Sequence, residues 1–271
     1  MRRAPKRFWM ACVQRSIDVN KPLLLTRTEP GASYQAQLLR ARGFQARVSP
    51  VLDILPLTPP LFSRRRKGGW VPADVSAAVA APPKLVIVLS GHAARAGLRS
   101  GVLDGLANAL FVAVGSQTAQ LLREAGRVVE VPLLESSEGV LQMPLIQTLL
   151  PADNVWVLAG TGGRTTLSER LLDEHGVSVL KVALYERVER KLAADVLPES
   201  IGGVVIGSVG GLSSFAGQWG ASKGDKAVPI VVPSARVASA AARSGFTSVY
   251  TADGAGTDAL VELLEDIAKN E

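Results

Sequence analysis

Small, hydroxylated and glycine-rich segments recur where the chain could bind anions. Each follows a short apolar run and precedes a helical pattern; they are residues 26–28, 90–92, 115–118, 160–164, 208–211 and 233–236. Backbone N–H groups at helix N-termini suit carboxylate or phosphate groups, and small residues allow their close approach. Any one such segment is equally an ordinary helix cap. Six of them together favour a large ligand with many acidic groups.

Conventional catalytic sets are absent from the sequence. His92 and His175 are its only histidines and Cys12 its only cysteine, so we expect no metal, no internal disulfide and no cofactor. The loop at Gly160 has neither the G-x-G-x-x-G spacing of dinucleotide sites nor the Lys-Ser/Thr ending of a Walker A motif. His175 precedes Gly176 at a predicted helix end, which favours a structural role. Any chemistry must therefore depend mainly on binding geometry.

Tyr185 is the phenol best placed for chemistry. It follows the apolar run 177–182, where the chain would leave a central domain and could face a cleft between domains. A packing or hydrogen-bonding role in the connection between domains is the alternative.

These candidates are carried by two βαβ patterns that each occur twice. Residues 155–185 repeat 23–50 with a constant offset that aligns Leu25 with Leu158, and residues 204–245 repeat 85–126. The connections at 51–84 and 183–203 are long for a compact domain. We therefore predict a central domain at 55–186, inserted into an outer domain at 21–54 plus 187–271. Two strands side by side would form the hinge, and residues 1–20 would form a basic tail.

The element pattern predicts an α/β fold with two Rossmann-like or flavodoxin-like parallel sheets. Glycines at 43, 126, 176 and 245 each end a helical pattern ahead of a β-branched run. The predicted strands are 85–89, 111–114, 128–131, 155–158 and 177–182 in the central domain, and 23–26, 45–49, 204–206, 230–232 and 248–250 in the outer one. One helix is expected over 139–150, and a last helix over 257–269 with an apolar stripe.

Composition indicates a cytoplasmic protein, and we expect a monomer without a nucleic-acid or membrane partner. The 271 residues include 30 basic and 24 acidic side chains, a balance of +6 that suits an anionic ligand. No apolar run reaches the length of a membrane span or signal peptide. The proline-rich stretch 51–83 predicts an extended segment, and the run Arg64 to Lys67 a solvated loop. Because no aromatic residues are interleaved with that run, nucleic-acid binding is the weaker reading.

Several of these segments together resemble the uroporphyrinogen-III synthase family. They are TRTEPGASYQAQLLRARGFQA, VGSQTAQLLREAG, GTGGRTTLSERLLDEHGVSVLKVALYERV and PSARVASAAARSGF, within residues 21–270. The resemblance implies a cofactor-free lyase of tetrapyrrole and heme biosynthesis. Its substrate would be hydroxymethylbilane, a linear tetrapyrrole polycarboxylate. The enzyme would close this chain to uroporphyrinogen III in an interdomain cleft, through a spiro intermediate that inverts the last ring.

The resemblance also implies roles for individual residues. Tyr185 matches the tyrosine proposed to assist departure of the substrate hydroxyl, while Ser90, Thr118 and Ser208 match the hydroxylated loops. The second copy of the Thr118 loop lacks that hydroxyl, and Ser234 or Arg236 would take over its contact. The loops complete the predicted substrate-binding set, which is Arg27, Ser90, Ser116, Thr118, Gly163, Arg164, Ser208, Ser234 and Arg236. A non-catalytic two-lobed binding protein for an anionic small molecule is the alternative function.

Overall fold

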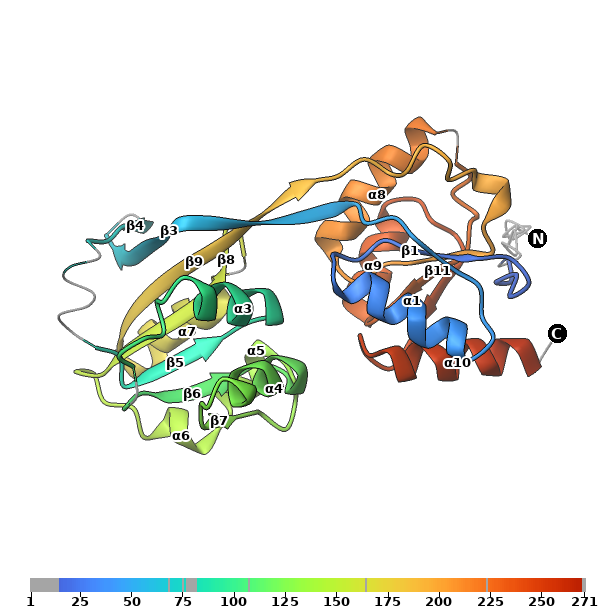
Figure 1. The fold of residues 1–271 in the computed structure, drawn as a ribbon. Coiled ribbons are helices and arrows are strands. Elements are labelled where there is room, and N and C mark those ends of the chain that lie inside the picture. The colour runs from blue at the N-terminus through green and yellow to red at the C-terminus, as the bar shows by residue number, and fades with distance from the viewer. Residues whose placement is uncertain are drawn as a thin grey trace, which may run out of the picture. The chain divides into compact units, whose positions relative to one another are not determined.

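The computed structural model describes residues 15–67, 69–74, 76, 82–106, 108–163, 165–222 and 224–269 (Figure 1). The predicted site residue Arg164 and residues 1–14 of the predicted tail lie outside this part. The chain divides into two compact units, Met1–Asp53 with Val188–Glu271, and Ile54–Arg187. The division falls within two long strands, β3 (Leu52–Arg66) and β9 (Ser178–Glu189).

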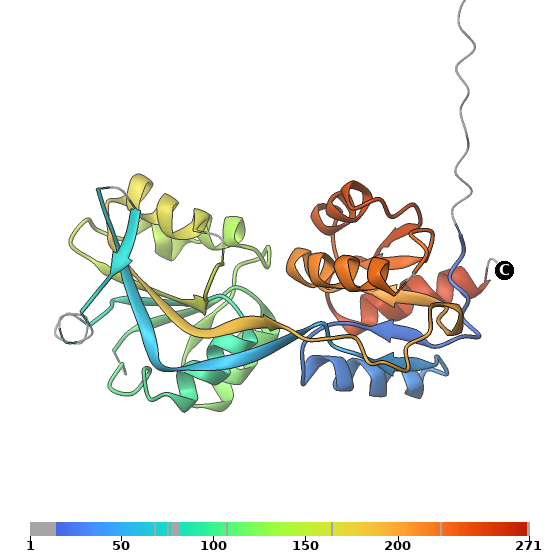
Figure 2. The ribbon, with the colours of Figure 1, turned by 90° about the horizontal axis from the view of Figure 1, so that it is seen from above.

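The first unit is built on a five-stranded sheet of order β12-β11-β10-β1-β2, in which all neighbours are parallel. Helices lie on both sides of its strands (Figure 2). The strands are β1 (Leu23–Leu25), β2 (Ala46–Val48), β10 (Gly203–Val205), β11 (Ile230–Val232) and β12 (Val249–Thr251), and the helices are α1 (Gly31–Ala41), α8 (Val209–Ala221), α9 (Ala235–Arg243) and α10 (Thr257–Lys269).

Alternation along β1 divides its leucines between two cores. Leu24 packs in the cluster of Phe215 from α8, whereas Leu23 and Leu25 pack in the cluster of Leu260 from α10. Such burial on both faces is what gives parallel strands their continuous apolar runs.

The second unit holds a seven-stranded sheet of order β4-β3-β9-β8-β5-β6-β7. Neighbours are parallel from β7 through β6, β5 and β8 to β9. Strands β3 and β4 pair with each other in antiparallel orientation. The remaining strands are β4 (Gly69–Pro72), β5 (Leu85–Val88), β6 (Leu110–Ala113), β7 (Val129–Glu130) and β8 (Asn154–Gly160), and the helices are α3 (Gly91–Arg99), α4 (Ser116–Glu124), α5 (Ser137–Leu141), α6 (Pro144–Gln147) and α7 (Thr166–His175). A short 3-10 turn, η1 (Pro198–Ser200), belongs to the first unit.

The predicted α/β class with two Rossmann-like units is confirmed. The glycines at 43, 126, 176 and 245 all have positive φ, between 66° and 88°. This left-handed backbone ends each helix, and glycine adopts it without a steric penalty. Helix α10 has its predicted bounds and buries Leu260 and Leu264 of the predicted stripe. In the part of the chain that the structure describes, no helix combines the length and apolarity needed to span a membrane.

Three details of the prediction are wrong. The second sheet is mixed, because β3 and β4 add to the five predicted strands. Most of the basic run therefore lies in a strand, although it stays exposed, and Arg65 pairs with Trp70. On the β4 side the prolines of β3 displace no ladder bond, because β4 pairs only with Ser63–Arg66, beyond them.

The third wrong detail is the helix expected over 139–150. It is two short helices, α5 and α6, with Pro144 opening the second one. Proline has no N–H for an i→i−4 bond and clashes with the preceding turn, so a continuous helix cannot pass through this position.

Candidate active site

The sheet order brings the predicted loops of each unit to one edge. Because β8, β5 and β6 are parallel neighbours, the loops that follow them, at Gly160, Ser90 and Gly115, are adjacent. In the first unit the loops after β1, β10 and β11, at Arg27, Ser208 and Ser234, are adjacent for the same reason. The carboxyl edge of a parallel sheet is where such folds bind ligands.

A β-bulge sets the direction of Tyr185. Ala159 is opposite Ala183, but Gly160 is opposite Tyr185, so one extra residue lies on β9. Leu184 and Tyr185 are consequently both buried in the same core cluster, where a regular strand would send them to opposite faces. The bulge thus places the ring on the α3 side of the sheet.

Gly160 leaves the space that the Tyr185 ring occupies. A Cβ at this position would lie 2.6 Å from Cε2 and 2.7 Å from Cζ of the ring. The backbone of the same loop also holds the tyrosine, because the N–H of Thr161 donates to the Tyr185 carbonyl at 2.8 Å. Any larger residue at position 160 would displace the ring.

The Tyr185 hydroxyl lies in a short hydrogen-bonded chain. Arg187 Nη2 donates to Tyr185 Oη at 2.8 Å, and Tyr185 Oη is 3.1 Å from Ser90 Oγ. Ser90 is the N-cap of α3, and its Oγ accepts from the N–H of Ala93 at 3.2 Å. The His92 ring lies 5.7 Å from the Tyr185 ring. The arginine and the helix N-terminus together put positive charge beside two hydroxyl groups, which suits a developing negative charge.

The other predicted residues of the second unit have different surroundings. The N–H of Ser116, at the start of α4, donates to Glu135 Oε1 at 2.9 Å, so a carboxylate of the chain already occupies this helix N-terminus. Thr118 is buried within α4, and Gly163 is exposed in the loop after β8.

Arg27 is a partly buried cation in the first unit. Burial lowers the pKa of its guanidinium, and the ion pairs formed among the described residues do not include it. Its Nε lies 3.0 Å from the position of a Cβ on Gly31, at the first turn of α1. A cation and a helix N-terminus in contact both favour an anion nearby. Glu29 already accepts the N–H of Ser33 in this turn.

The serines of the first unit differ in their capping. Ser208 Oγ accepts from the N–H of Gly211 at 3.1 Å and caps α8. Ser234 occupies the same place before α9, but its side chain makes no capping bond. Arg236 is exposed in the first turn of α9. Helix capping therefore explains why a serine stands at position 208, but it does not explain the serine at position 234.

Sequence reasoning missed Arg187 and Glu135. Arg187 follows Tyr185 by two residues on a strand, a spacing that points to a shared face and could have identified it. Glu135 is 19 residues from Ser116, and no local pattern connects the two.

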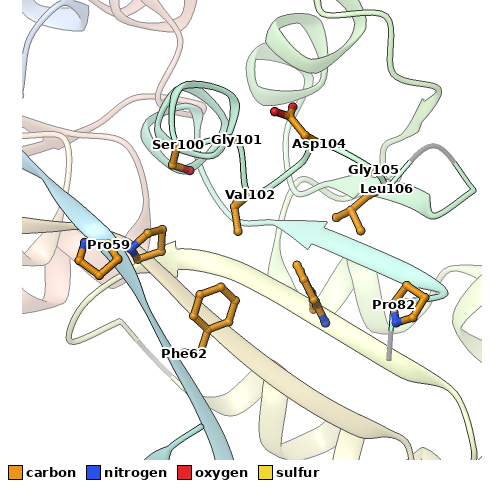
Figure 3. A pocket seen from close by; sticks show the side chains of 11 residues that line it. Pro59, Phe62, Pro82, Ser100, Gly101, Val102, Asp104, Gly105 and Leu106 are labelled. Atoms are coloured by element: carbon orange, nitrogen blue, oxygen red, sulfur yellow. The ribbon is translucent and has the colours of Figure 1, made fainter. Parts of the chain in front are cut away.

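Neither a metal cluster nor the larger of the two cavities in the second unit coincides with these loops in the described part of the chain. Among the residues described, none cluster in a group of three or more that could hold a metal ion. A cavity of about 480 Å³, lined by Phe62, Pro82, Leu106 and Trp156, borders the segments that lead into β5 and β6 (Figure 3). It lies away from the carboxyl-edge loops because those segments enter the strands at their amino ends.

Fold and loops together define a class of protein: a two-unit α/β protein whose parallel sheets present hydroxyl, glycine and arginine residues at their carboxyl edges. The sequence matches the family described as uroporphyrinogen-III synthase HemD over residues 33–262, and the chain belongs to this family. It is accordingly an enzyme of the lyase class in porphyrin and heme biosynthesis.

Solved structures of such synthases are similar in fold. A mutant enzyme from the extremely thermophilic bacterium Thermus thermophilus is 17% identical, with a TM-score of 0.57 over 92% of this chain and 100% of that one. The enzyme from Helicobacter pylori is 15% identical, with a TM-score of 0.58 over 91% of this chain and 99% of that one. At these identities the likeness concerns the fold alone.

Proposed function

We propose that this chain cyclises hydroxymethylbilane to uroporphyrinogen III with inversion of the last pyrrole ring. The observation that carries the proposal is the chain of hydrogen bonds from Arg187 through Tyr185 to Ser90, at the carboxyl edge of a sheet in a member of this family. The substrate is a polycarboxylate, and we propose that the loop sets of both units hold it in a cleft between them.

Tyr185 supplies the proton in this proposal, and Ser90 delivers it. The Tyr185 side chain is only 1% exposed, whereas Ser90 is half-buried. Tyr185 Oη accepts from Arg187, so its own proton can be donated to Ser90 Oγ. Ser90 Oγ then accepts from Ala93 and Tyr185, which leaves its hydrogen for the departing hydroxyl of the substrate.

The reaction steps balance without a further reactant. The pyrrole nitrogen pushes out the hydroxyl, which takes the proton from Ser90 and leaves as water, while Tyr185 reprotonates the serine. The last ring then bonds to the freed methylene carbon through its substituted position and forms the spiro intermediate. The older methylene bond to the spiro carbon then breaks, and the released methylene carbon bonds to the other α-carbon of the ring, which inverts the ring. That α-carbon loses its proton, which restores the pyrrole, and the proton returns through Ser90 to Tyr185.

Binding the carboxylates is the larger part of the proposed catalysis. Closure without an enzyme leaves the ring unflipped, so the substrate must be held while the spiro carbon rearranges. Arg27, Ser234 and Arg236 are the proposed anion contacts of the first unit. The partly buried Arg27 suits this role because an acidic group would neutralise it.

The test is the ratio of type III to type I uroporphyrinogen formed from hydroxymethylbilane. We expect Tyr185→Phe and Ser90→Ala each to lower the rate by up to about 10²-fold, because general acid catalysis is worth about this much. The double variant should be no slower than the worse single one, because both groups move the same proton. Ring inversion should persist in all three.

A cap-loss control separates chemistry from folding. Ser136 Oγ caps α5 through the N–H of Gly139 at 3.0 Å, so Ser136→Ala removes an N-cap without touching Tyr185. Unchanged turnover per folded molecule in Tyr185→Phe would remove Tyr185 from the mechanism. A wild-type protein that binds the bilane without changing the isomer ratio would instead be the two-lobed binding protein.

A further inference from the structure

A second cavity of the second unit borders the loop that carries Gly160. Its volume is about 340 Å³, and it lies among β3, β4, β8 and β9. Its walls are mostly apolar and include Phe62, Trp70, Pro72 and Val157, and it reaches the backbone of residues 160–162. An apolar cavity with few polar groups is the usual form of a small-molecule site.

Lys181 is the sole charged side chain among the described residues that line this cavity. Its Nζ lies 4.6 Å from the centre of the Trp70 ring. Burial lowers the pKa of this lysine, although the charge of Glu169 opposes the shift. The Glu169 carboxylate is itself bound to Arg65 Nη1 at 3.1 Å and Thr165 Oγ1 at 2.8 Å. In the described part of the chain, Lys181 therefore forms no ion pair within 4.0 Å.

Trp70 adds a second donor without an acceptor. Its Nε1 is buried and has no hydrogen-bond partner among the described residues. Buried N–H groups in native proteins are nearly always paired. The ammonium lies over the face of the Trp70 ring and forms no ion pair among the described residues, so an acceptor that carries negative charge would complete this side of the cavity.

We propose that this cavity binds a carboxylate attached to a flat apolar body, with the carboxylate at Lys181 and the body against Trp70 and Val157. The volume suits one aromatic ring with a short acidic arm and is too small for a whole tetrapyrrole. The ligand is either one acidic pyrrole of the bilane, which rests on the proposed function, or a separate small acid. Both present the same chemistry to Lys181.

The test compares indole-3-propionate with its neutral amide, indole-3-propionamide, by isothermal titration calorimetry on the whole chain. We expect the acid to bind and the amide to bind about tenfold more weakly or worse, because the amide loses the charge-assisted bond. Lys181→Met should weaken binding of the acid to a similar extent. Lys226→Met is the matched control, since Lys226 also lies over an aromatic ring, 4.1 Å from the centre of Phe246, but belongs to the other unit.

Several results would overturn the proposal. They are equal affinities for the acid and the amide, undiminished binding by Lys181→Met, and absence of binding at about 10 mM acid. The comparison of acid with amide uses the wild-type protein, so it holds even if Lys181→Met fails to fold.

Steady-state kinetics with hydroxymethylbilane then separate the two sources. If the acid competes with the bilane and Lys181→Met raises KM without lowering kcat, the cavity holds an arm of the substrate. If the acid is not competitive and KM is unchanged, the cavity holds a separate small acid. The calorimetry needs no turnover, so failure of the cyclisation assay would refute the proposed function and leave the cavity to be judged on its own.

Discussion

Replacing Gly160 by alanine should damage both the stability and the turnover of this protein. The added Cβ would lie 2.6 Å from Cε2 of Tyr185, whereas ordinary contacts begin at 3.4 Å, so the ring or the loop must move by about 0.8 Å. The Tyr185 side chain is 1% exposed and packed in the core, so it has little room to move. Overpacking of this kind costs about 1–3 kcal/mol of unfolding free energy.

The expected effects follow from that displacement. In a unit of this size each kcal/mol lowers Tm by about 2–4 °C. A shift of nearly 1 Å would also lengthen the contacts of Tyr185 Oη with Ser90 and Arg187, now 3.1 and 2.8 Å. Misplacement on this scale can reduce the rate by about 10²-fold. We expect most of that loss in kcat.

Thermal melts and the isomer assay on four proteins check this reasoning: wild type, Gly160→Ala, Tyr185→Phe and the double variant. Phenylalanine keeps the ring carbons that clash, so Gly160→Ala should lower Tm equally in both backgrounds. It should slow turnover much less when the hydroxyl is already gone. Gly217→Ala is the control, because outside its own stretch of helix no atom of the described residues lies within 4 Å of the added Cβ. Wild-type Tm and turnover in Gly160→Ala would refute the placement of the ring.

Two further predictions concern single hydrogen bonds. Arg187→Met removes the donor to Tyr185 Oη at 2.8 Å, and because Arg187 is exposed we expect only about a 3- to 10-fold loss of kcat, measured on protein with an unchanged Tm. Partial recovery in Arg187→Lys would support the role of charge, whereas full activity in Arg187→Met would exclude it. Ser208→Ala should lose about 1 kcal/mol of stability with the N-cap of α8, while Ser234→Ala should melt as the wild type does, since its side chain caps nothing. Equal Tm losses in the two serine variants would contradict this difference.

Part of the candidate site could be predicted from the sequence. The sequence predicts Ser90 in a carboxyl-edge loop and Tyr185 just after the strand 177–182, and the two hydroxyls lie 3.1 Å apart. The strand end is wrong, because β9 continues to Glu189 and contains Tyr185. The direction of the tyrosine could not be predicted, because the bulge opposite Gly160 depends on how β8 and β9 pair. The contact of the Glu135 carboxylate with the start of α4 could not be predicted either, because contacts between distant residues leave no local sequence pattern.

The α/β class, the two copies of each βαβ pattern and the helix ends follow from the amino-acid sequence alone. These depend on local rules: apolar runs for buried parallel strands, and glycine where the backbone must turn left-handed at Gly176 and its counterparts. The prediction of two connecting strands side by side is confirmed, because β3 and β9 are neighbours. Only in the tertiary structure does β4 pair with β3 and the sheet of the second unit grow to seven strands, because strand pairing depends on the partner as well. The same holds for Lys181, which in the sequence is one polar residue in an apolar strand. Its isolation beside Trp70 arises only when β4 and β9 are brought into one sheet.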